Sequence, residues 1–358
     1  MTELAAIDAD GHVIEPEDMW PSYLPPALVP LAPRWVTDTQ GRTRRLIGGR
    51  VQPHIPFPQT EYASHPVLGA ADPKSRLQEM DQHGIEVSVI YPSAALHFAS
   101  IPEPEVVIAL SRAYNDWLAG FCSTDPSRLV GIAALPQCDI PASMAEARRA
   151  VGELGFRGVF LRPNPIAGRT LDHPGFDPLW STLEELDVPV GVHEATTMNV
   201  PEAGTDRYDN YLFLHVISHP HEHQMAMLSL ICGGVLERHP RLRFAFLESG
   251  CGWVPYWLER MDQHVRYWGG ASRPLALRPS EYFARQCFVS PFADETVLPD
   301  VIGRLGVSNL IYTTDYPYPY TTTPRIPDAL RHRDDIAGDA MKPILRDNAS
   351  RFYRLNGS

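Results

Sequence analysis

Short hydrophobic runs alternate with longer segments of helical period along most of the chain. Most runs are rich in β-branched or aliphatic residues and lack strict alternation of polar and apolar positions, which is typical of strands buried on both faces of a parallel sheet. The predicted strands are Ala5–Ala9, Ile85–Tyr91, Leu129–Leu135, Gly158–Leu161, Val188–Val192, Leu242–Leu247, Cys287–Val289 and Leu310–Tyr312. The predicted helices are Lys74–His83, Glu105–Cys122, Ala142–Leu154, Phe176–Leu186, His221–Glu237, Val254–Tyr267 and Glu295–Leu305.

This alternation predicts an α/β fold, a distorted (β/α)8 (TIM) barrel, as one domain over residues 1–358. A doubly wound open sheet is the alternative, but no GxGxxG follows any predicted strand. Residues 15–73 are Pro-rich and irregular, so we expect an insertion after the first strand that caps the barrel mouth. Residues 273–282 are expected to form a looser loop.

Charge and composition exclude several classes of partner. The 358 residues carry a net charge of −12 without a basic patch, which argues against nucleic acid and anionic lipid surfaces. The longest nearly apolar stretch, Met225–Leu236, is too short for a membrane span, and no signal peptide pattern opens the sequence. Five cysteines without CxxC spacing suit a reducing compartment. We therefore expect a cytoplasmic protein.

Residues whose side chains can bind a metal ion, transfer a proton or bind a carboxylate follow the predicted strands, where a barrel places its active site. They are Asp10, His12, Arg162, His193, Glu248 and Asp315. Asp-x-His occurs three times, so the spacing alone says little. The pairs at 81/83 and 262/264 lie in predicted helices, where side chains two apart diverge. Asp10 and His12 continue a strand, where side chains two apart share a face and can bind one metal ion.

Each of these residues also has an ordinary structural explanation. His193 can be a hydrogen-bonded core residue, Asp315 a turn former before a Pro-rich segment, and Glu248 a helix cap. Their joint occurrence at four strand ends favours a metal centre instead. Imidazole and carboxylate ligands without thiolates fit Zn²⁺, Mn²⁺ or Fe²⁺.

A second histidine cluster comprises His215, His219, His221 and His223. His215 and His219 have the i, i+4 spacing of helical metal ligands, but Pro220 predicts a junction between loop and helix there. A polar pocket wall, with His219 contacting substrate, and a His-rich surface loop are the alternatives. Nucleophilic catalysis has little support, because GxSxG is absent and Cys251 has no clear histidine partner.

Several segments together resemble the amidohydrolase superfamily, in the branch typified by aminocarboxymuconate-semialdehyde decarboxylase. They are IDADGHV, GVFLRPNP, PVGVHE, GGVLERHPRLRFAFLESGCGWVPYWLERMD, YTTDYP and LRDNASRFYRL, in the family's order. The resemblance covers nearly the whole chain outside 15–73 and implies a distorted barrel with one divalent metal, Zn or Mn.

The resemblance also implies roles for individual residues. Asp10 and His12 occupy the family's H-x-H, and His193 and Asp315 match its later ligands, so these four are the expected metal site. Glu248 stands where decarboxylases of the family place a catalytic histidine, and Tyr318 replaces the histidine of D-Y-P-H.

These features predict a metal-dependent enzyme that decarboxylates a small aromatic or unsaturated carboxylic acid without oxidation. Hydrolysis of an amide or lactone and a non-catalytic ligand-binding barrel are the alternatives. We expect Glu248 and Asp315 to be catalytic. Glu248 can transfer a proton if desolvation raises its pKa toward neutrality; binding to the metal, which would hold it ionised, and a structural role are its alternatives. Arg162 and Trp253 are further expected substrate contacts; a structural ion pair is the alternative for Arg162. We also expect a homo-oligomer, a dimer.

Overall fold

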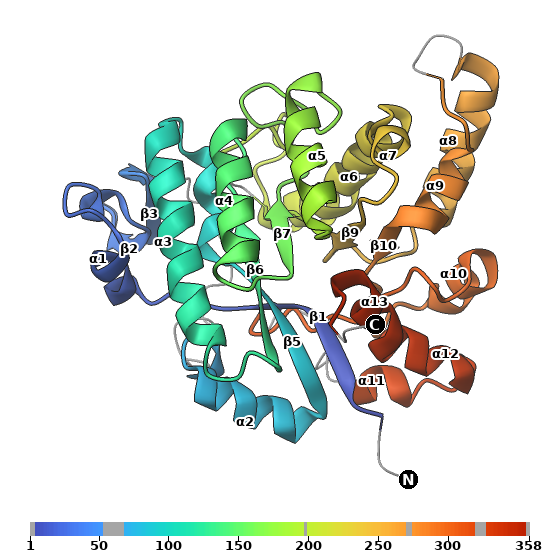
Figure 1. Cartoon of the computed structure of the whole chain (residues 1–358), viewed down its shortest axis with the longest axis horizontal. Coiled ribbons are helices and arrows are strands. Elements are labelled where there is room, and N and C mark those ends of the chain that lie inside the picture. Colours follow the sequence, from blue (N-terminus) through green and yellow to red (C-terminus); the bar gives the residue numbers. More distant parts are fainter. Residues whose placement is uncertain (1–3, 53–67, 197–198, 270–273, 319–326, 356–358) are drawn as a thin grey trace.

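The computed structural model describes residues 4–52, 68–196, 199–269, 274–318 and 327–355. Its centre is a curved sheet of seven parallel strands in the order β1-β5-β6-β7-β8-β9-β10 (Figure 1). The strands are β1 (Ala6–His12), β5 (Ile85–Tyr91), β6 (Leu129–Ala134), β7 (Gly158–Leu161), β8 (Val190–His193), β9 (Phe244–Leu247) and β10 (Cys287–Val289). Nearly every residue in them is buried, which confirms the expectation of a sheet covered on both faces.

The eighth predicted strand, Leu310–Tyr312, is not a regular strand, yet its segment closes the barrel. Leu310 forms an isolated parallel bridge with Val289 of β10. On the other side, the Ala9 N–H of β1 donates to Tyr312 O at 2.9 Å, and Asp315 N–H donates to Asp10 O at 2.9 Å. The predicted distorted barrel is therefore confirmed, with the distortion located beside β1.

Helices surround the sheet and connect its strands (Figure 1). They are α2 (Pro73–His83), α3 (Pro104–Cys122), α4 (Ile140–Gly152), α5 (Asp177–Leu186), α6 (Tyr211–Cys232), α7 (Val235–Arg238), α8 (Val254–Trp268), α9 (Pro279–Gln286), α10 (Leu298–Leu305), α11 (Pro327–Arg331), α12 (Gly338–Lys342) and α13 (Asn348–Tyr353). Local sequence sets their ends: Asp72 caps α2 by accepting from Ser75 N–H, and Gly84 ends it in a left-handed conformation.

The helix predicted at His221–Glu237 was placed wrongly. Helix α6 begins ten residues earlier and continues through Pro220, so the expected junction between loop and helix is absent there. Proline removes one backbone donor and usually breaks a helix. Here the helix is kept by packing, because residues on both sides of Pro220, including Leu214 and Met227, are buried in the core.

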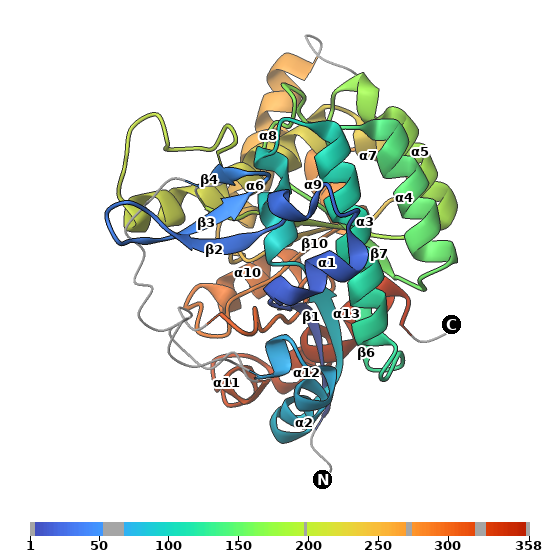
Figure 2. The same ribbon diagram turned by 90° about the vertical axis from the view of Figure 1, so that its left-hand side faces the viewer.

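Two further segments are more regular than the sequence suggested. Part of the expected loop at 273–282 is the start of α9, where Glu281 accepts from the Arg278 backbone N–H. The insertion contains α1 (Trp20–Tyr23) and an antiparallel sheet of β2 (Arg34–Thr37), β3 (Thr43–Ile47) and β4 (Arg50–Val51), with residues 53–67 outside the described part (Figure 2). Arginines on β3 hid the apolar pattern; Arg45, for example, covers the Trp35 ring at 4.7 Å.

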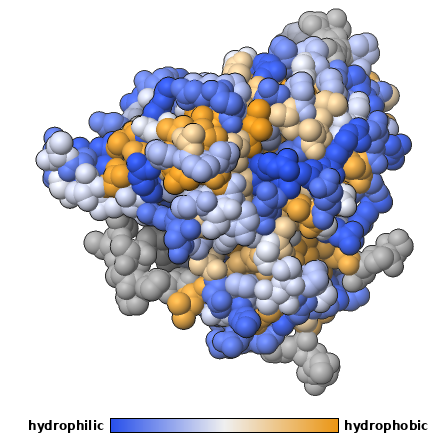
Figure 3. Space-filling view, turned by 60° about the vertical axis from the view of Figure 1, so that its left-hand side comes forward, coloured by the Kyte–Doolittle hydropathy of each residue, from blue (hydrophilic) through white to orange (hydrophobic). Residues whose placement is uncertain are grey.

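The surface is mixed in character. Figure 3 shows hydrophobic areas among hydrophilic ones on one face of the molecule. Several large apolar side chains of α6 and α8 are exposed, namely Leu212, Phe213, Val216, Met225, Leu228, Tyr256, Tyr267 and Trp268. Among the described residues, the helices are too short or too polar to span a bilayer.

Candidate metal centre

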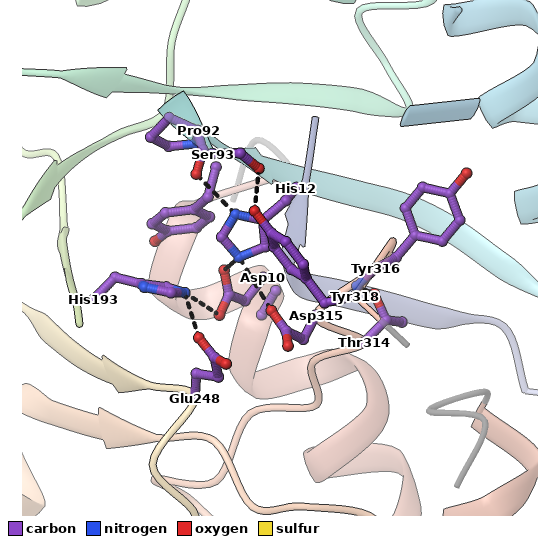
Figure 4. Close-up of polar contacts among 12 residues, drawn as sticks. Asp10, His12, Pro92, Ser93, His193, Glu248, Thr314, Asp315, Tyr316 and Tyr318 are labelled. Carbon is purple, nitrogen blue, oxygen red and sulfur yellow. Dashed lines mark hydrogen bonds and ion pairs between the residues drawn. The ribbon is translucent and has the colours of Figure 1, made fainter. Parts of the chain in front are cut away.

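The first two candidate ligands lie at the carboxyl end of β1. Asp10 and His12 are fully buried and point toward the side chains that follow the other strands (Figure 4). His12 Nδ1 lies 2.9 Å from Pro92 O, so the Nδ1 proton has an acceptor and the Nε2 lone pair faces the centre. The guanidinium of Arg76 donates to His12 O at 3.0 Å and fixes the backbone there.

His193, the last residue of β8, faces the same centre. Its Nδ1 lies 2.6 Å from Glu194 O, which again directs Nε2 inward. His193 Nε2 is 3.5 Å from Asp10 Oδ2 and 3.4 Å from Glu248 Oε2. Burial alone would lower the pKa of His193, but the carboxylates of Asp10 and Glu248 raise it to about 9.

Asp315 enters from the segment that closes the barrel, and its Oδ1 lies 3.3 Å from His12 Nε2. Its φ of 53° is in the left-handed region, which is uncommon for residues other than glycine. Buried Asp8 supports this conformation by accepting from Thr314 N–H at 2.9 Å and from the Thr314 hydroxyl at 2.8 Å. The same carboxylate accepts from Asp10 N–H at 3.3 Å, so it joins the two ends of the site.

The spacing of these atoms suits a shared metal ion. Metal–ligand bonds of ~2.0–2.2 Å at tetrahedral or octahedral angles separate the ligand atoms by roughly 3–3.5 Å. The pairs above lie 3.3–3.5 Å apart, beyond ordinary hydrogen-bond distances. Within the described part of the chain, Asp10 Oδ1 and Oδ2, His12 Nε2 and His193 Nε2 receive no hydrogen bond although all are buried. The residues therefore fit a divalent cation of the zinc or manganese type.

Glu248 follows β9 and is also buried, with a positive φ of 56°. Its N–H donates to Ser290 Oγ at 3.0 Å. The next residues are held by Glu295, whose carboxylate accepts from the N–H groups of Cys251 and Gly252 at 2.7–3.0 Å. This clamp holds the backbone that presents Glu248 in a strained conformation.

The expectation that desolvation raises the pKa of Glu248 toward neutrality is wrong. Burial does favour the neutral form, but His219 and His193 lie within 3.5 Å and His215 adds to their effect. Their positive charge holds the pKa of Glu248 well below its usual range. Glu248 is therefore a carboxylate at neutral pH.

Arg162 follows β7 and is buried in a polar network. It donates to Asn164 Oδ1 at 2.7 Å, to Glu194 Oε1 at 3.0 Å and to Ala195 O at 3.1 Å. These contacts are those of the structural ion pair, the alternative given for this residue. Direct contact with a substrate carboxylate requires Arg162 to give up Glu194, and that role stays a prediction.

The other two expected substrate contacts belong to helix α6 and to the start of α8. His219 of α6 places Nε2 at 3.5 Å from Glu248 Oε2. The indole of Trp253, at the start of α8, donates to Gly250 O at 3.0 Å and is partly exposed. His219 therefore lies beside Glu248, and contact of either residue with substrate remains a prediction.

Residues outside the ligand set also shape the centre; the sequence motif singled out Tyr318 among them, but not Asp8, Arg76 or Glu295. Tyr318 lies with its ring 5.1 Å from that of His12 and donates its hydroxyl proton to Ser93. Asp8, Arg76 and Glu295 act through backbone groups, so no spacing rule reveals them. An acidic residue within the predominantly hydrophobic first strand was the single available signal, because a charge is not buried without partners.

Comparison with known proteins establishes the family. The family model described as amidohydrolase matches residues 7–355. The chain belongs to the amidohydrolase family. A 2-amino-3-carboxymuconate-6-semialdehyde decarboxylase of Dictyostelium discoideum is 28% identical over 254 residues, covering 69% of this chain and 67% of that protein. A gamma-resorcylate decarboxylase of Rhodococcus jostii (strain RHA1) is 32% identical over 256 residues, covering 68% and 76%. The resemblance inferred from the sequence motifs is confirmed.

Solved structures share the fold of this amidohydrolase over nearly its whole length. An amidohydrolase from Mycobacterium avium subsp. paratuberculosis K-10 superposes with a TM-score of 0.81 at 21% identity, covering 99% of this chain and 98% of that one. A dihydroxybenzoic acid decarboxylase from Polaromonas sp. JS666, with bound manganese and 2-nitroresorcinol, gives a TM-score of 0.70 at 22% identity, covering 99% and 98%.

We expect His193→Ala to reduce the occupancy of this centre to well below one ion per chain, because it removes a ligand atom whose ring orientation is fixed by Glu194 O. Removing a residue that only hydrogen-bonds to a metal ligand typically lowers metal affinity by roughly 10–100-fold. Removing the ligand itself should lower the affinity by at least as much. Elemental analysis after dialysis measures the metal, and circular dichroism checks the fold. His264→Ala, at a partly exposed position on α8, is the matched control. Full metal content in His193→Ala at limiting metal concentration contradicts the assignment.

We expect Arg162→Met to lower the free energy of unfolding by about 3–5 kcal/mol, because it leaves the buried Glu194 carboxylate without its charged partner. The double variant Arg162→Met/Glu194→Leu should recover much of this loss, since it removes both charges. Urea denaturation of the two variants measures the difference. Equal stability of Arg162→Met and wild type would show that the pair is not structural.

Proposed function

We propose that this amidohydrolase is a metal-dependent decarboxylase of a small aromatic or unsaturated carboxylic acid, acting without oxidation. The observation that carries the proposal is the convergence of Asp10, His12, His193 and Asp315 beside the ionised Glu248. These four residues would hold one divalent ion, Zn or Mn, and the manganese in the Polaromonas decarboxylase supports that choice. When bound, such an ion polarises a substrate oxygen as a Lewis acid.

The choice of decarboxylation over hydrolysis rests on the relatives. The Dictyostelium protein is named for an unsaturated acid and the Rhodococcus protein for an aromatic one, and both are decarboxylases. Their similarity extends over about two thirds of this chain. Hydrolysis of an amide or lactone is an outcome that the assay below tests.

Decarboxylation breaks one carbon–carbon bond and consumes one proton. The electron pair of the broken bond stays on the substrate carbon, which must then receive the proton, while carbon dioxide leaves. We assign the transfer of this proton to Glu248. Because its pKa is low, Glu248 starts as a carboxylate. It would take up one proton from solvent and pass it to the carbon that loses carbon dioxide.

Substrate contacts and assembly complete the proposal. His219 lies beside Glu248 and would bind the substrate near the reacting carbon. Trp253 would also contact the substrate, and Arg162 would join them if it exchanged Glu194 for a substrate carboxylate. The exposed apolar side chains of α6 and α8 support a homodimer, since patches of this kind usually mark interaction surfaces. A cytoplasmic location remains a prediction.

The enzyme loaded with Mn²⁺ or Zn²⁺ should release carbon dioxide from a member of a panel of hydroxybenzoic and unsaturated carboxylic acids. Carbon dioxide release and loss of substrate absorbance measure the reaction, and a chelator should abolish it. His264→Ala, outside the centre, should retain full activity. Turnover of amides or lactones without any carbon dioxide release would replace the proposal with hydrolysis, and inactivity on every class would favour a binding protein.

Glu248→Gln should lower kcat by roughly 10²–10⁴-fold, because the amide keeps the shape of the side chain but does not carry the proton. The ion held by Asp10, His12, His193 and Asp315 should be retained, as elemental analysis would show. Undiminished turnover removes Glu248 from the mechanism. Loss of that ion places Glu248 among its ligands instead.

A further inference from the structure

Helix α6 brings two further imidazoles to Glu248. His215 and His219 are four residues apart on one face of the helix, and their ring centroids lie 4.6 Å apart. One nitrogen of each ring and one oxygen of Glu248 all lie within 4.8 Å of one another. The distance between His219 Nε2 and Glu248 Oε2 is 3.5 Å, the same spacing that separates candidate ligands in the first centre. Pro220 does not disturb this geometry because α6 continues through it.

We propose that His215, His219 and Glu248 form a second divalent-cation site beside the first centre, whose own ligands remain Asp10, His12, His193 and Asp315. The same Glu248 oxygen lies 3.4 Å from His193 Nε2 and 3.5 Å from His219 Nε2, so it stands between the two groups of imidazoles. Two imidazoles and one carboxylate are a donor set that zinc and related divalent ions favour, with further positions left for water or substrate.

The surroundings of His219 hold it in the orientation that a ligand needs. Its Nδ1 lies 3.2 Å from Ser218 Oγ and 3.4 Å from Thr196 Oγ1, and these two hydroxyls are 2.8 Å from each other. These oxygens can accept a hydrogen bond from the Nδ1–H group, which leaves Nε2 directed at Glu248. His219 is buried, whereas His215 is partly exposed and gives the site a path to solvent.

Charge balance gives a second reason for another cation. Asp10, Asp315 and Glu248 bring three negative charges to one buried region. One divalent ion with neutral imidazoles leaves a net charge of about −1, which opposes entry of a carboxylate substrate into a site of low dielectric. A second divalent ion changes the net charge to about +1 and favours an anionic substrate. A proton held by His219 is the competing source of positive charge.

The proposal is tested by counting Zn²⁺ ions per chain at saturation. Metal-free full-length protein is dialysed against a series of buffered free Zn²⁺ concentrations and analysed by elemental mass spectrometry. Wild type should bind two ions. His215→Asn and His219→Asn should each bind one, and His221→Asn, an exposed histidine on the same helix, should bind two. Circular dichroism verifies that the variants fold.

The outcomes separate this proposal from the proposed function. His12→Asn should lose the ion of the first centre and keep the one at His215 and His219. Binding of a single ion by wild type, with no effect of His215→Asn, overturns the second site and leaves the first intact; His219 then carries the proton. Two ions in both His215→Asn and His219→Asn overturn it as well. If wild type binds an ion at His215 and His219 but none at the first centre, the result contradicts the proposed function and leaves the second site intact.

Discussion

Three buried carboxylates converge on one point at the mouth of this barrel, and most features of the surrounding structure follow from that constraint. Asp10, Asp315 and Glu248 each lie within 3.5 Å of an imidazole nitrogen, and all three are almost entirely buried. Concentrating negative charge in a region of low dielectric is strongly unfavourable unless cations compensate it. The three carboxylates therefore require positive charge nearby, which protonated imidazoles or divalent ions can supply.

The backbone around the centre is held by groups that do not reach it. Glu248 and Asp315 both have left-handed backbone conformations, each with a cost on the order of 1–3 kcal/mol. Glu295 accepts hydrogen bonds from the loop after Glu248, and Asp8 accepts from the residue before Asp315. Two separate carboxylates thus stabilise the two strained turns, which places the reactive side chains without adding charge at the ion itself.

Much of this arrangement could be predicted from the sequence because it depends on strand order. Residues that follow successive parallel strands must meet at one end of a barrel, so His193, Glu248 and Asp315 could be brought together from hydrophobic runs alone. Helix α6 could not be placed, because the tertiary packing that carries it through Pro220 leaves no local signal. The pKa of Glu248 was also beyond the sequence, since its direction depends on imidazoles that come from α6 and β8.

The central claim is that Asp10, His12, His193 and Asp315 hold one catalytic divalent ion. A crystal structure of the enzyme grown with Mn²⁺, with anomalous scattering measured at the manganese edge, tests it most directly. The account predicts an anomalous peak at about 2.0–2.3 Å from a ligand atom of each of the four residues. A fully loaded crystal whose peaks all lie away from these residues would contradict the account.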